Sequence, residues 1–414
     1  MSKLNPEPKR FAPLLERLVI GMVVTVLLML AAKFIEHRTF GRRIETTMFE
    51  ILQWPLPKSN KALPIIVVNM SDVPRDMDLV TSRAAIRRTL QAVVDQGPLA
   101  VGIDLDFSPG LDGWIADDDP QFFEFCLKLK QERNVPIFLG VYRTTGAGPE
   151  TWLGSKDYKE LAAALTLNVD TKRLPLWVQA KDSSEKLPTL GAALADTYGP
   201  TQLDPASWFS RVVEVTRDNK PGIEREAEDR MVFGESLVNY TKLEKIQNSA
   251  LREVSPASIA ESRDLLRGKI VLIGDATRFE DPFNIAGRER SIAGVYVLAC
   301  VVYTLAVEPL YELNIPVRLF LDLSISILLM LVVERLRVRY VKKRPGSKFF
   351  EARNKAVWIV IALVSLSGLL IVRLTNIMWF DIPLIAAALL LHPKIEHRVD
   401  DAWKKLRPKK KRAR

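Results

Sequence analysis

Histidine and cysteine are scarce in this 414-residue chain. The three histidines, His37, His392 and His397, each lie beside an apolar segment near one end of the chain, so we expect no Ser-His-Asp or Cys-His catalytic arrangement in the central region. The two cysteines, Cys126 and Cys300, stand within apolar helical patterns. This setting predicts buried small hydrophobic residues, and it argues against a disulfide or a cysteine-bound metal.

Phosphate-binding and dinucleotide-binding motifs are also missing. Gly274-Asp275 is not followed by Gly-Lys-Thr, and Gly146-Ala147-Gly148 does not open a helix of the dinucleotide-binding type. We therefore expect no cofactor and no enzymatic activity. A hydrolase that uses only carboxylates remains as the catalytic alternative.

Basic residues outnumber acidic ones and give a formal net charge of +10. They gather beside apolar segments, and the largest group forms the C-terminal run 404–414. This placement follows the positive-inside rule for cytoplasmic flanks of membrane helices. Anionic lipid headgroups are a second possible partner of the same residues. We expect no nucleic-acid partner.

Four apolar segments have the composition of transmembrane helices. The first, 18–35, is close to the length that crosses the hydrocarbon layer. A cleaved signal peptide is the alternative, because the small residues Ala31 and Ala32 follow its apolar run. The three other segments are 317–334, 356–374 and a shorter one at 378–392. The lipid bilayer is therefore an expected partner.

The distribution of positive charge predicts the orientation of these segments. The connection 335–355 is rich in Lys and Arg, whereas 375–381 contains neither. The N-terminal residues 1–17 and the tail 393–414 are also basic. Placing the basic parts in the cytoplasm exports residues 36–316. The sequence thus predicts a multi-pass protein of the inner (plasma) membrane with a large extracytoplasmic domain.

One carboxyl group lies near the outer end of the second apolar segment. Asp322 follows Arg318 by four residues. An ion pair between these two side chains at the membrane interface is the favoured interpretation. A functional carboxylate at membrane depth is the alternative.

The central region predicts an α/β fold, with a mostly parallel sheet covered by helices on both faces. Apolar β-branched runs indicate strands, and amphipathic stretches between them indicate helices. In chain order these are a strand at 64–72, a helix at 82–96, a strand at 99–107, a helix at 121–133, a strand at 134–142 and a later strand at 270–273. Such alternation predicts right-handed crossovers and parallel pairing.

The part of the central region between the third strand and the last is less regular. We expect a helix at 187–198, a strand at 211–217, a charged connection at 220–230, a strand at 236–240 and a short helix at 255–262. After the last strand, an apolar helix over 291–311 is expected to lead out of the domain.

Polar side chains gather where the predicted parallel strands end. The carboxyl ends of such strands meet at one edge of the sheet, which is the usual ligand crevice of open α/β sheets. The candidate ligand-binding residues are Asp72, Arg75, Asp104, Asp106, Tyr142, Asp275 and Arg278, with Asn69 beside them. The carboxylates suit a divalent cation or a cationic small molecule, whereas the two arginines suit an anion. In a purely structural alternative, Asp72 and residues 117–119 cap helices, and Asp104 and Asp106 bond loop amides.

Several motifs occur in a familiar order along the chain. They are Phe49-Glu50-Ile51-Leu52, the run Val101 to Pro109, Leu237-Val238-Asn239-Tyr240, the run Leu266 to Gly274, and Gly294-Val295. Their succession over residues 39–391 resembles the type-two CHASE domains, extracellular sensors found in front of bacterial cyclases, histidine kinases and protein kinases. The resemblance implies an unknown extracellular ligand and a role in signal transduction.

The chain departs from that family pattern in two places. Where family members often carry a histidine shortly after the Gly-Val pair, this chain has Val297-Leu298-Ala299-Cys300. The family usually continues into a cytoplasmic catalytic domain, whereas this sequence ends at Arg414, shortly after Leu391. The resemblance thus implies a stand-alone sensor that acts on a separate effector protein or on a second copy of itself. A structural or assembly subunit of a cell-envelope complex is the alternative.

Overall fold

The structure is a computed structural model of the whole chain. It describes residues 23, 39–56, 62–73, 81–108, 118–142, 156–165, 172–180, 186–199, 213–214, 216–217, 222–223, 230–252, 255–276, 282–285, 291–343, 349–380, 385–386, 390 and 398. The chain divides into two compact units. One comprises residues 56–312, and the other comprises residues 1–55 together with 313–414.

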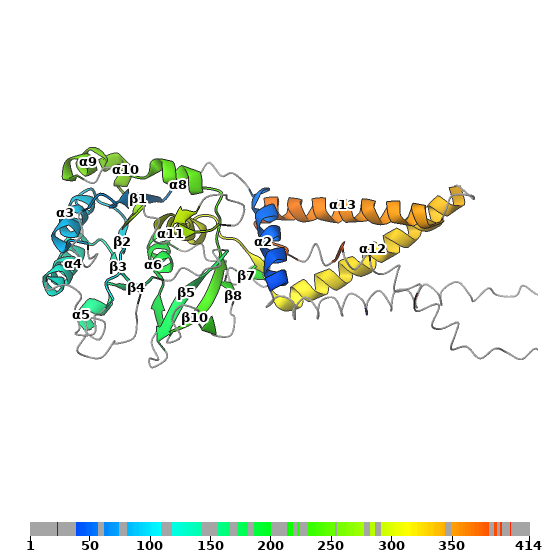
Figure 1. The fold of residues 1–414 in the computed structure, drawn as a ribbon, viewed down its shortest axis with the longest axis horizontal. Coiled ribbons are helices and arrows are strands. Elements are labelled where there is room, and N and C mark those ends of the chain that lie inside the picture. Colours follow the sequence, from blue (N-terminus) through cyan, green and yellow to red (C-terminus); the bar gives the residue numbers. More distant parts are fainter. Residues whose placement is uncertain are drawn as a thin grey trace, which may run out of the picture. The chain divides into compact units, whose positions relative to one another are not determined.

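A five-stranded parallel sheet forms the centre of the unit 56–312 (Figure 1). Its strands are β1 (Ile65–Asn69), β2 (Ala100–Asp104), β3 (Ile137–Val141), β4 (Ala162–Ala164) and β11 (Ile270–Gly274), in the order β1-β11-β2-β3-β4. All its neighbouring strands run parallel. Every residue of β11 is buried, as expected for an apolar strand in the middle of a covered sheet. The predicted α/β fold and the four strands that the sequence placed in this sheet are confirmed.

Helices cover both faces of this sheet (Figure 1). Successive side chains of a strand point to opposite sides, so alternate residues of β2 contact the helices on opposite faces of the sheet. Val101 and Ile103 join a core with residues of α3 (Arg83–Val94), α4 (Asp119–Arg133), α9 (Pro256–Glu261) and α10 (Arg263–Leu266). Gly102 faces α6 (Leu190–Tyr198), where a Cβ atom would come 2.6 Å from Leu194 Cδ1. On that second face α6 packs against α11 (Gly294–Ala306), which also contacts α8 (Leu243–Ser249) and β1.

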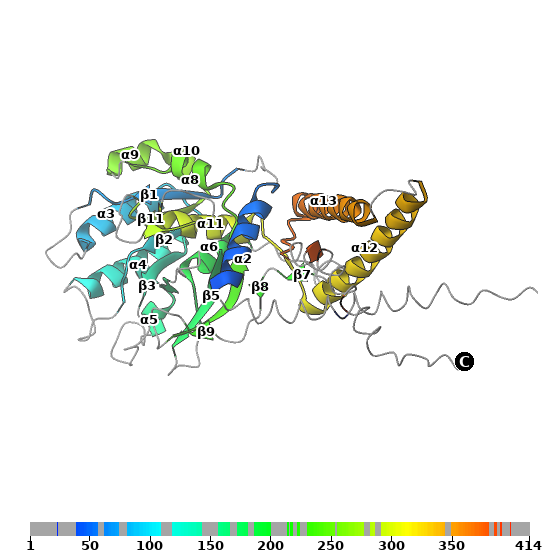
Figure 2. The same ribbon diagram turned by 45° about the vertical axis from the view of Figure 1, so that its right-hand side comes forward.

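A second sheet, which the sequence did not predict, contains antiparallel strands (Figure 2). Its strands are β5 (Arg173–Ala180), β6 (Lys186–Pro188), β8 (Thr216–Arg217), β9 (Gly222–Ile223) and β10 (Arg230–Leu237). The helix predicted from residue 187 therefore begins only at Leu190, because 186–188 pair with β5. The strand predicted at 236–240 is the end of β10, which begins at Arg230 and pairs along its length with β5.

Short elements complete this unit. They are α5 (Lys156–Lys159), β7 (Val213–Glu214), β12 (Pro282–Phe283), β13 (Ile292–Ala293) and β14 (Glu312–Leu313), whose last residue belongs to the other unit. The strand predicted over 211–217 is thus two separate pieces, β7 and β8. The short helix expected at 255–262 is α9, with a capping box in which Ser255 and Ser258 satisfy each other's backbone N–H groups.

The helix predicted over 291–311 is shorter than expected at both ends. Residues 292 and 293 form β13, which pairs with β12, so α11 begins at Gly294. The helix stops at Ala306, and the Val307 N–H donates to the Tyr303 carbonyl. Pro309 accounts for the stop, because proline has no N–H to donate and disfavours helical geometry in the preceding residue. The chain therefore leaves the helix before it reaches the next unit.

The other unit contains α2 (Thr39–Gln53), α12 (Ile315–Lys343) and α13 (Phe349–Thr375). In α13 the buried residues Val357, Val360, Val364 and Val372 recur at helical spacing, whereas Trp358, Leu363, Leu366 and Leu374 are exposed. α13 contacts α12. The carboxylate of Asp322 on α12 accepts a hydrogen bond of 3.0 Å from Trp379 Nε1, in a buried position.

Among the described residues, one helical segment is long and apolar enough to cross a membrane, Val357–Thr375. It agrees with the segment predicted at 356–374. The segment predicted at 317–334 lies within α12, which continues through the basic residues up to Lys343, and a membrane crossing by this segment stays a prediction. The connection expected at 335–355 is therefore helical at both ends. The segments predicted at 18–35 and 378–392 fall mostly outside the described residues.

Candidate ligand site at the carboxyl edge of the parallel sheet

The register of the sheet brings three strand ends together at one edge. Asn69 of β1 lies opposite Gly274 of β11, and Gly274 lies opposite Asp104 of β2. The Asn69 side chain is buried, and its Oδ1 accepts from the Ser71 N–H at 3.1 Å and the Ala276 N–H at 2.9 Å. Asn69 thus holds the turns that follow β1 and β11.

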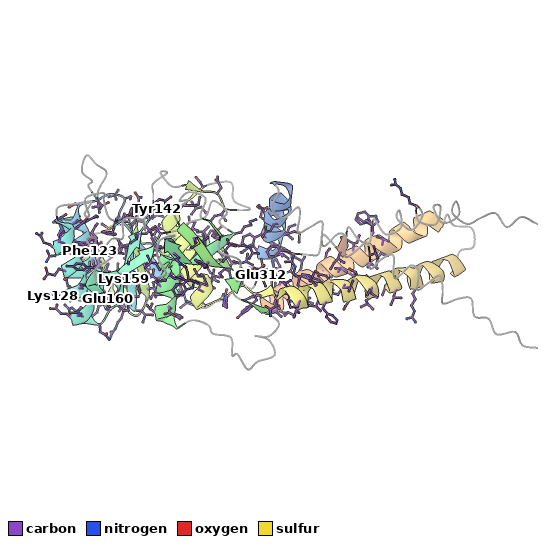
Figure 3. All side chains as sticks on the ribbon, turned by 90° about the horizontal axis from the view of Figure 1, so that it is seen from below. Phe123, Lys128, Tyr142, Lys159, Glu160 and Glu312 are labelled. Atoms are coloured by element: carbon purple, nitrogen blue, oxygen red, sulfur yellow. The ribbon has the colours of Figure 1, made fainter. Side chains whose placement is uncertain are left out.

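Asp106 and Tyr142 meet where β2 and β3 end. The Asp106 Oδ1 accepts from the Ser108 N–H at 2.8 Å, from the Ser108 hydroxyl and from the Tyr142 N–H at 3.1 Å. The Ser108 Oγ also accepts from the Tyr142 N–H at 2.9 Å. The interpretation in which Asp106 bonds loop amides therefore describes this residue. Figure 3 labels Tyr142 on this part of the unit.

Asp104 and the start of α11 both lie close to Gly274. A Cβ atom at Gly274 would be 3.0 Å from the Asp104 Cβ and 3.0 Å from Val295 Cγ2, closer than ordinary side-chain contacts. The absence of a side chain at Gly274 thus lets the half-buried Asp104 approach the first turn of α11, to which Val295 belongs.

The remaining candidate residues lie at the same edge or outside the described residues. Asp72 is exposed and Asp275 is half-buried, each shortly after the end of its strand. Arg75 and Arg278 are outside the described residues. The structure therefore places Asp104, Asp106, Tyr142 and Asp275 at one edge of the sheet, as the sequence predicted. They stand at or just after the ends of β2, β3 and β11, which are neighbouring strands.

One of the two predicted helix caps occupies its expected position in the structure. The N-cap of α3 is Ser82, whose Oγ accepts from the Ala85 N–H at 3.4 Å, so Asp72 does not have that role. The N-cap of α4 is Asp118, which makes no side-chain capping bond. Asp119 instead turns toward α3.

Asp119 forms a buried ion pair that sequence reasoning missed. Its Oδ1 accepts from Arg83 Nε at 2.6 Å, and the two residues are only 3% and 4% exposed. The Arg83 Cζ lies 4.4 Å from the centre of the Phe107 ring, which stacks on Phe122 at 5.5 Å. A cation over an aromatic face is stabilised by the ring quadrupole. The pair joins the first residues of α3 and α4 beside the carboxyl edge.

Cys126 lies close enough to this pair to be affected by its charge. Burial raises the pKa of the Cys126 thiol far above its ordinary value, against the opposing influence of Arg83 and Arg87. The thiol is therefore protonated at neutral pH and is a poor nucleophile. Cys126 and Cys300 are both buried and free, as predicted.

Acidic side chains at the edge do not form a metal site in the described part of the chain. No group of three His, Cys, Asp or Glu residues in that part is arranged to hold a metal ion. Asp106 directs one oxygen to loop donors, and Asp119 directs one oxygen to Arg83.

A second buried ion pair lies where the unit 56–312 ends. The Arg173 Nη1 and Nη2 groups donate to the two carboxylate oxygens of Glu312, with 2.7 Å between Nη2 and Oε1. Nearby, the Asn239 N–H donates to Thr304 Oγ1 at 2.8 Å, and the Thr304 hydroxyl donates to the Cys300 carbonyl at 2.6 Å. Figure 3 labels Glu312 at the end of this unit away from Phe123. These contacts tie α11 and the segment after it to β5 and to the residues following β10.

Comparison with known families agrees with this architecture. A family model described as the CHASE2 domain matches residues 19–334, which is more than half of the chain. The comparison with curated proteins and the comparison with solved structures each found no match. CHASE2 domains are extracellular sensor domains of signal transduction. The resemblance identified from the motifs is thereby confirmed, and the chain belongs to the CHASE2 family.

Proposed function

We propose that this CHASE2 chain is a membrane-anchored, non-enzymatic sensor. It binds a small ligand or an ion outside the cell, at the carboxyl edge of the parallel sheet, and signals through its membrane helices to a separate effector protein. Family membership supports a sensing role in general. The observation that carries the specific proposal is the position of Asp104, which lies across Gly274 from the first turn of α11.

The packing of α11 makes it a suitable element for relaying a ligand signal. α11 contacts β1, β11, α6 and α8, so it lies against the sheet over its length. Ten of its residues are buried. A ligand that interacts differently with two positions of such a helix shifts the balance between them. Asp104 and Val295 of that helix lie on either side of Gly274.

The relay must leave α11 by way of other elements, because the helix ends at Ala306. Thr304 is bonded to the backbone of Asn239, and Glu312 is bonded to Arg173. Both partners belong to or follow the strands β5 and β10. We propose that displacement of α11 reaches α12 through this antiparallel sheet and through Glu312, three residues before α12 begins.

Anchoring in the bilayer is supported by the second unit. The segment Val357–Thr375 has the length and composition of a membrane helix, and its outward side chains include Trp358, Leu363, Leu366 and Leu374. Large apolar surfaces of this kind require a nonaqueous partner. We propose that this segment and the predicted segments 18–35, 317–334 and 378–392 together make the chain a multi-pass protein of the inner (plasma) membrane.

A ligand screen on the full-length protein in detergent tests the sensing proposal. A small molecule or ion present well above its Kd is expected to raise Tm by about 5 °C. Asp104→Asn should remove this rise. Asp95→Asn is the matched control, because Asp95 follows α3 and pairs with Arg133 in an exposed position. A ligand whose stabilisation survives Asp104→Asn contradicts binding at this edge.

A compartment reporter tests the proposed orientation independently. A reporter fused near Lys220 should be active only outside the cytoplasm, and one fused after Arg414 only inside. A cytoplasmic signal from the Lys220 fusion would overturn the extracytoplasmic placement.

A further inference from the structure

The guanidinium of Arg83 keeps one donor without an acceptor in a buried place. Its Nε group pairs with Asp119, yet Nη2 is buried and has no hydrogen-bond partner. Arginine presents five N–H donors in a rigid fork that matches carboxylate and phosphate oxygens. Buried donors without acceptors are rare in folded proteins, and each one calls for a physical explanation.

The surroundings of this donor favour an anion. The Phe107 ring lies under the guanidinium, and Phe122 stacks on Phe107, so one side of the group is apolar. Charged hydrogen bonds are stronger in such low-dielectric surroundings. Arg83 and Asp119 are also the first residues of helices of 12 and 15 residues. The N-terminus of a helix of this length carries partial positive charge.

We propose that Arg83 binds an oxyanion, and that the ligand of this sensor carries a carboxylate or phosphate group that accepts from Nη2. This inference rests on the proposed sensing function. With Arg83 only 4% exposed, the partner must be a small molecule, because a polypeptide or nucleic acid does not reach the group. Entry of the anion requires the packing between the first turns of α3 and α4 to open. Binding is thereby coupled to a change of conformation, as sensing requires.

Asp119 has a definite part in this arrangement. It supplies a counter-charge to Arg83 through a single contact to Nε, and so leaves Nη2 for the ligand. An oxyanion therefore shares Arg83 with Asp119. Neutralising Asp119 should strengthen anion binding, whereas a purely structural ion pair predicts stabilisation by anions only in variants that lack Asp119, and none in the unmodified protein.

Acetate and inorganic phosphate are suitable probes for the full-length protein in detergent. Each is titrated to tens of millimolar against sodium chloride at matched ionic strength, and Tm is measured. We expect a rise of about 3 °C at a concentration ten times the Kd. Acetate tests recognition of carboxylates and phosphate tests recognition of phosphates. The probe that gives the larger rise identifies the ligand group.

Four variants complete the experiment. Arg83→Gln and Arg83→Lys should abolish or reduce the rise. Asp119→Asn should enlarge it, and this variant keeps the test decisive if the Arg83 variants do not fold. Arg87→Gln is the matched control, because Arg87 stacks on Phe125 at the same 4.4 Å but is exposed. Its rise should equal that of the unmodified protein.

Two results would overturn the inference. One is the absence of any rise in the unmodified protein, and the other is a rise that persists in Arg83→Gln. A ligand from the wider screen that depends on Asp104 but not on Arg83 would also contradict the inference while leaving the sensing function intact.

Discussion

Two buried arginines in the unit 56–312 use their guanidinium groups differently. Arg173 donates through both Nη groups to both oxygens of Glu312, so its fork is fully engaged with one carboxylate. Arg83 reaches Asp119 through Nε alone and keeps a buried Nη2 without an acceptor. The first pair lies beside the antiparallel sheet, and the second lies between two helices that follow parallel strands.

The difference distinguishes a structural ion pair, Arg173–Glu312, from an arginine that can bind a further ligand, Arg83. A bidentate Arg–carboxylate pair fixes distance and angle and leaves little capacity for another partner. An ion pair made through one nitrogen neutralises the arginine charge and leaves the other N–H groups of the guanidinium able to donate to another partner. Structural pairing thus accounts for both Nη groups of Arg173, whereas it leaves the Nη2 group of Arg83 unexplained. Three measurements test this contrast.

The largest effect is expected where the engaged pair is broken. Glu312→Gln leaves the Arg173 charge buried, and we expect a loss of about 3 kcal/mol in the free energy of unfolding. Thermal and urea unfolding of the full-length protein measure it. Lys128→Gln is the control, because the Lys128–Glu132 pair is exposed and its loss should change stability by less than about 0.5 kcal/mol.

The double variant Arg173→Met with Glu312→Met sharpens the same experiment. It removes both charges from the buried position, so most of the lost stability should return. A double variant as unstable as Glu312→Gln would contradict this expectation. It would show that the pair stabilises the fold beyond the mutual neutralisation of two buried charges.

A smaller difference is expected when each arginine is replaced by lysine. Arg173→Lys loses one of two charge-assisted hydrogen bonds, which costs about 2 kcal/mol. Arg83→Lys keeps a single contact to Asp119 within reach, and its cost should be about 1 kcal/mol or less. The same unfolding measurements compare the two. Equal costs at the two positions would contradict the distinction between an engaged and an open fork.

The smallest effect is a pH dependence beside the open pair. The unfolded Cys126 thiol ionises near pH 9.0, whereas burial keeps the folded thiol protonated because its pKa is raised. Stability present below that pH is therefore lost as the pH rises above it. The difference in stability between the unmodified protein and Cys126→Ala should shrink above pH 9.0. A difference that stays constant with pH would contradict the buried, protonated thiol.

Most of the parallel sheet could be predicted because its strands are unbroken apolar runs. Ile65 to Val68 and Ile270 to Ile273 are β-branched or aliphatic throughout, a pattern that indicates strands covered on both faces. The residues at the carboxyl edge could be predicted for the same reason, since adjacent parallel strands bring Asp104 and Gly274 side by side. Here the local pattern and the tertiary environment agree.

The antiparallel sheet could not be predicted in the same way. β5 contains Pro175 and begins with Arg173, and β10 contains Gly234 within a partly charged stretch. Neither shows a clear alternation of apolar and polar residues. Their strand conformation comes from pairing with each other across a long separation in sequence, which no local pattern records.

Arg83 was missed for a related reason. In the sequence Arg83-Ala84-Ala85-Ile86-Arg87-Arg88 it looks like one of several arginines on the polar side of an amphipathic helix. Its burial depends on Asp119, which is 36 positions later in the chain. A charge of one sign followed by a distant charge of the other gives no signal until the fold places them together.

The position of β11 has a consequence for how the protein is made. Ile65 pairs with Ile270, and β11 separates β1 from β2, so the first strand has no neighbour in the parallel sheet until the last one has been synthesised. Such distant pairing slows folding. The nascent chain therefore carries an unpaired apolar strand through most of its elongation, and its assembly is completed only when the final segment is inserted between strands that already exist.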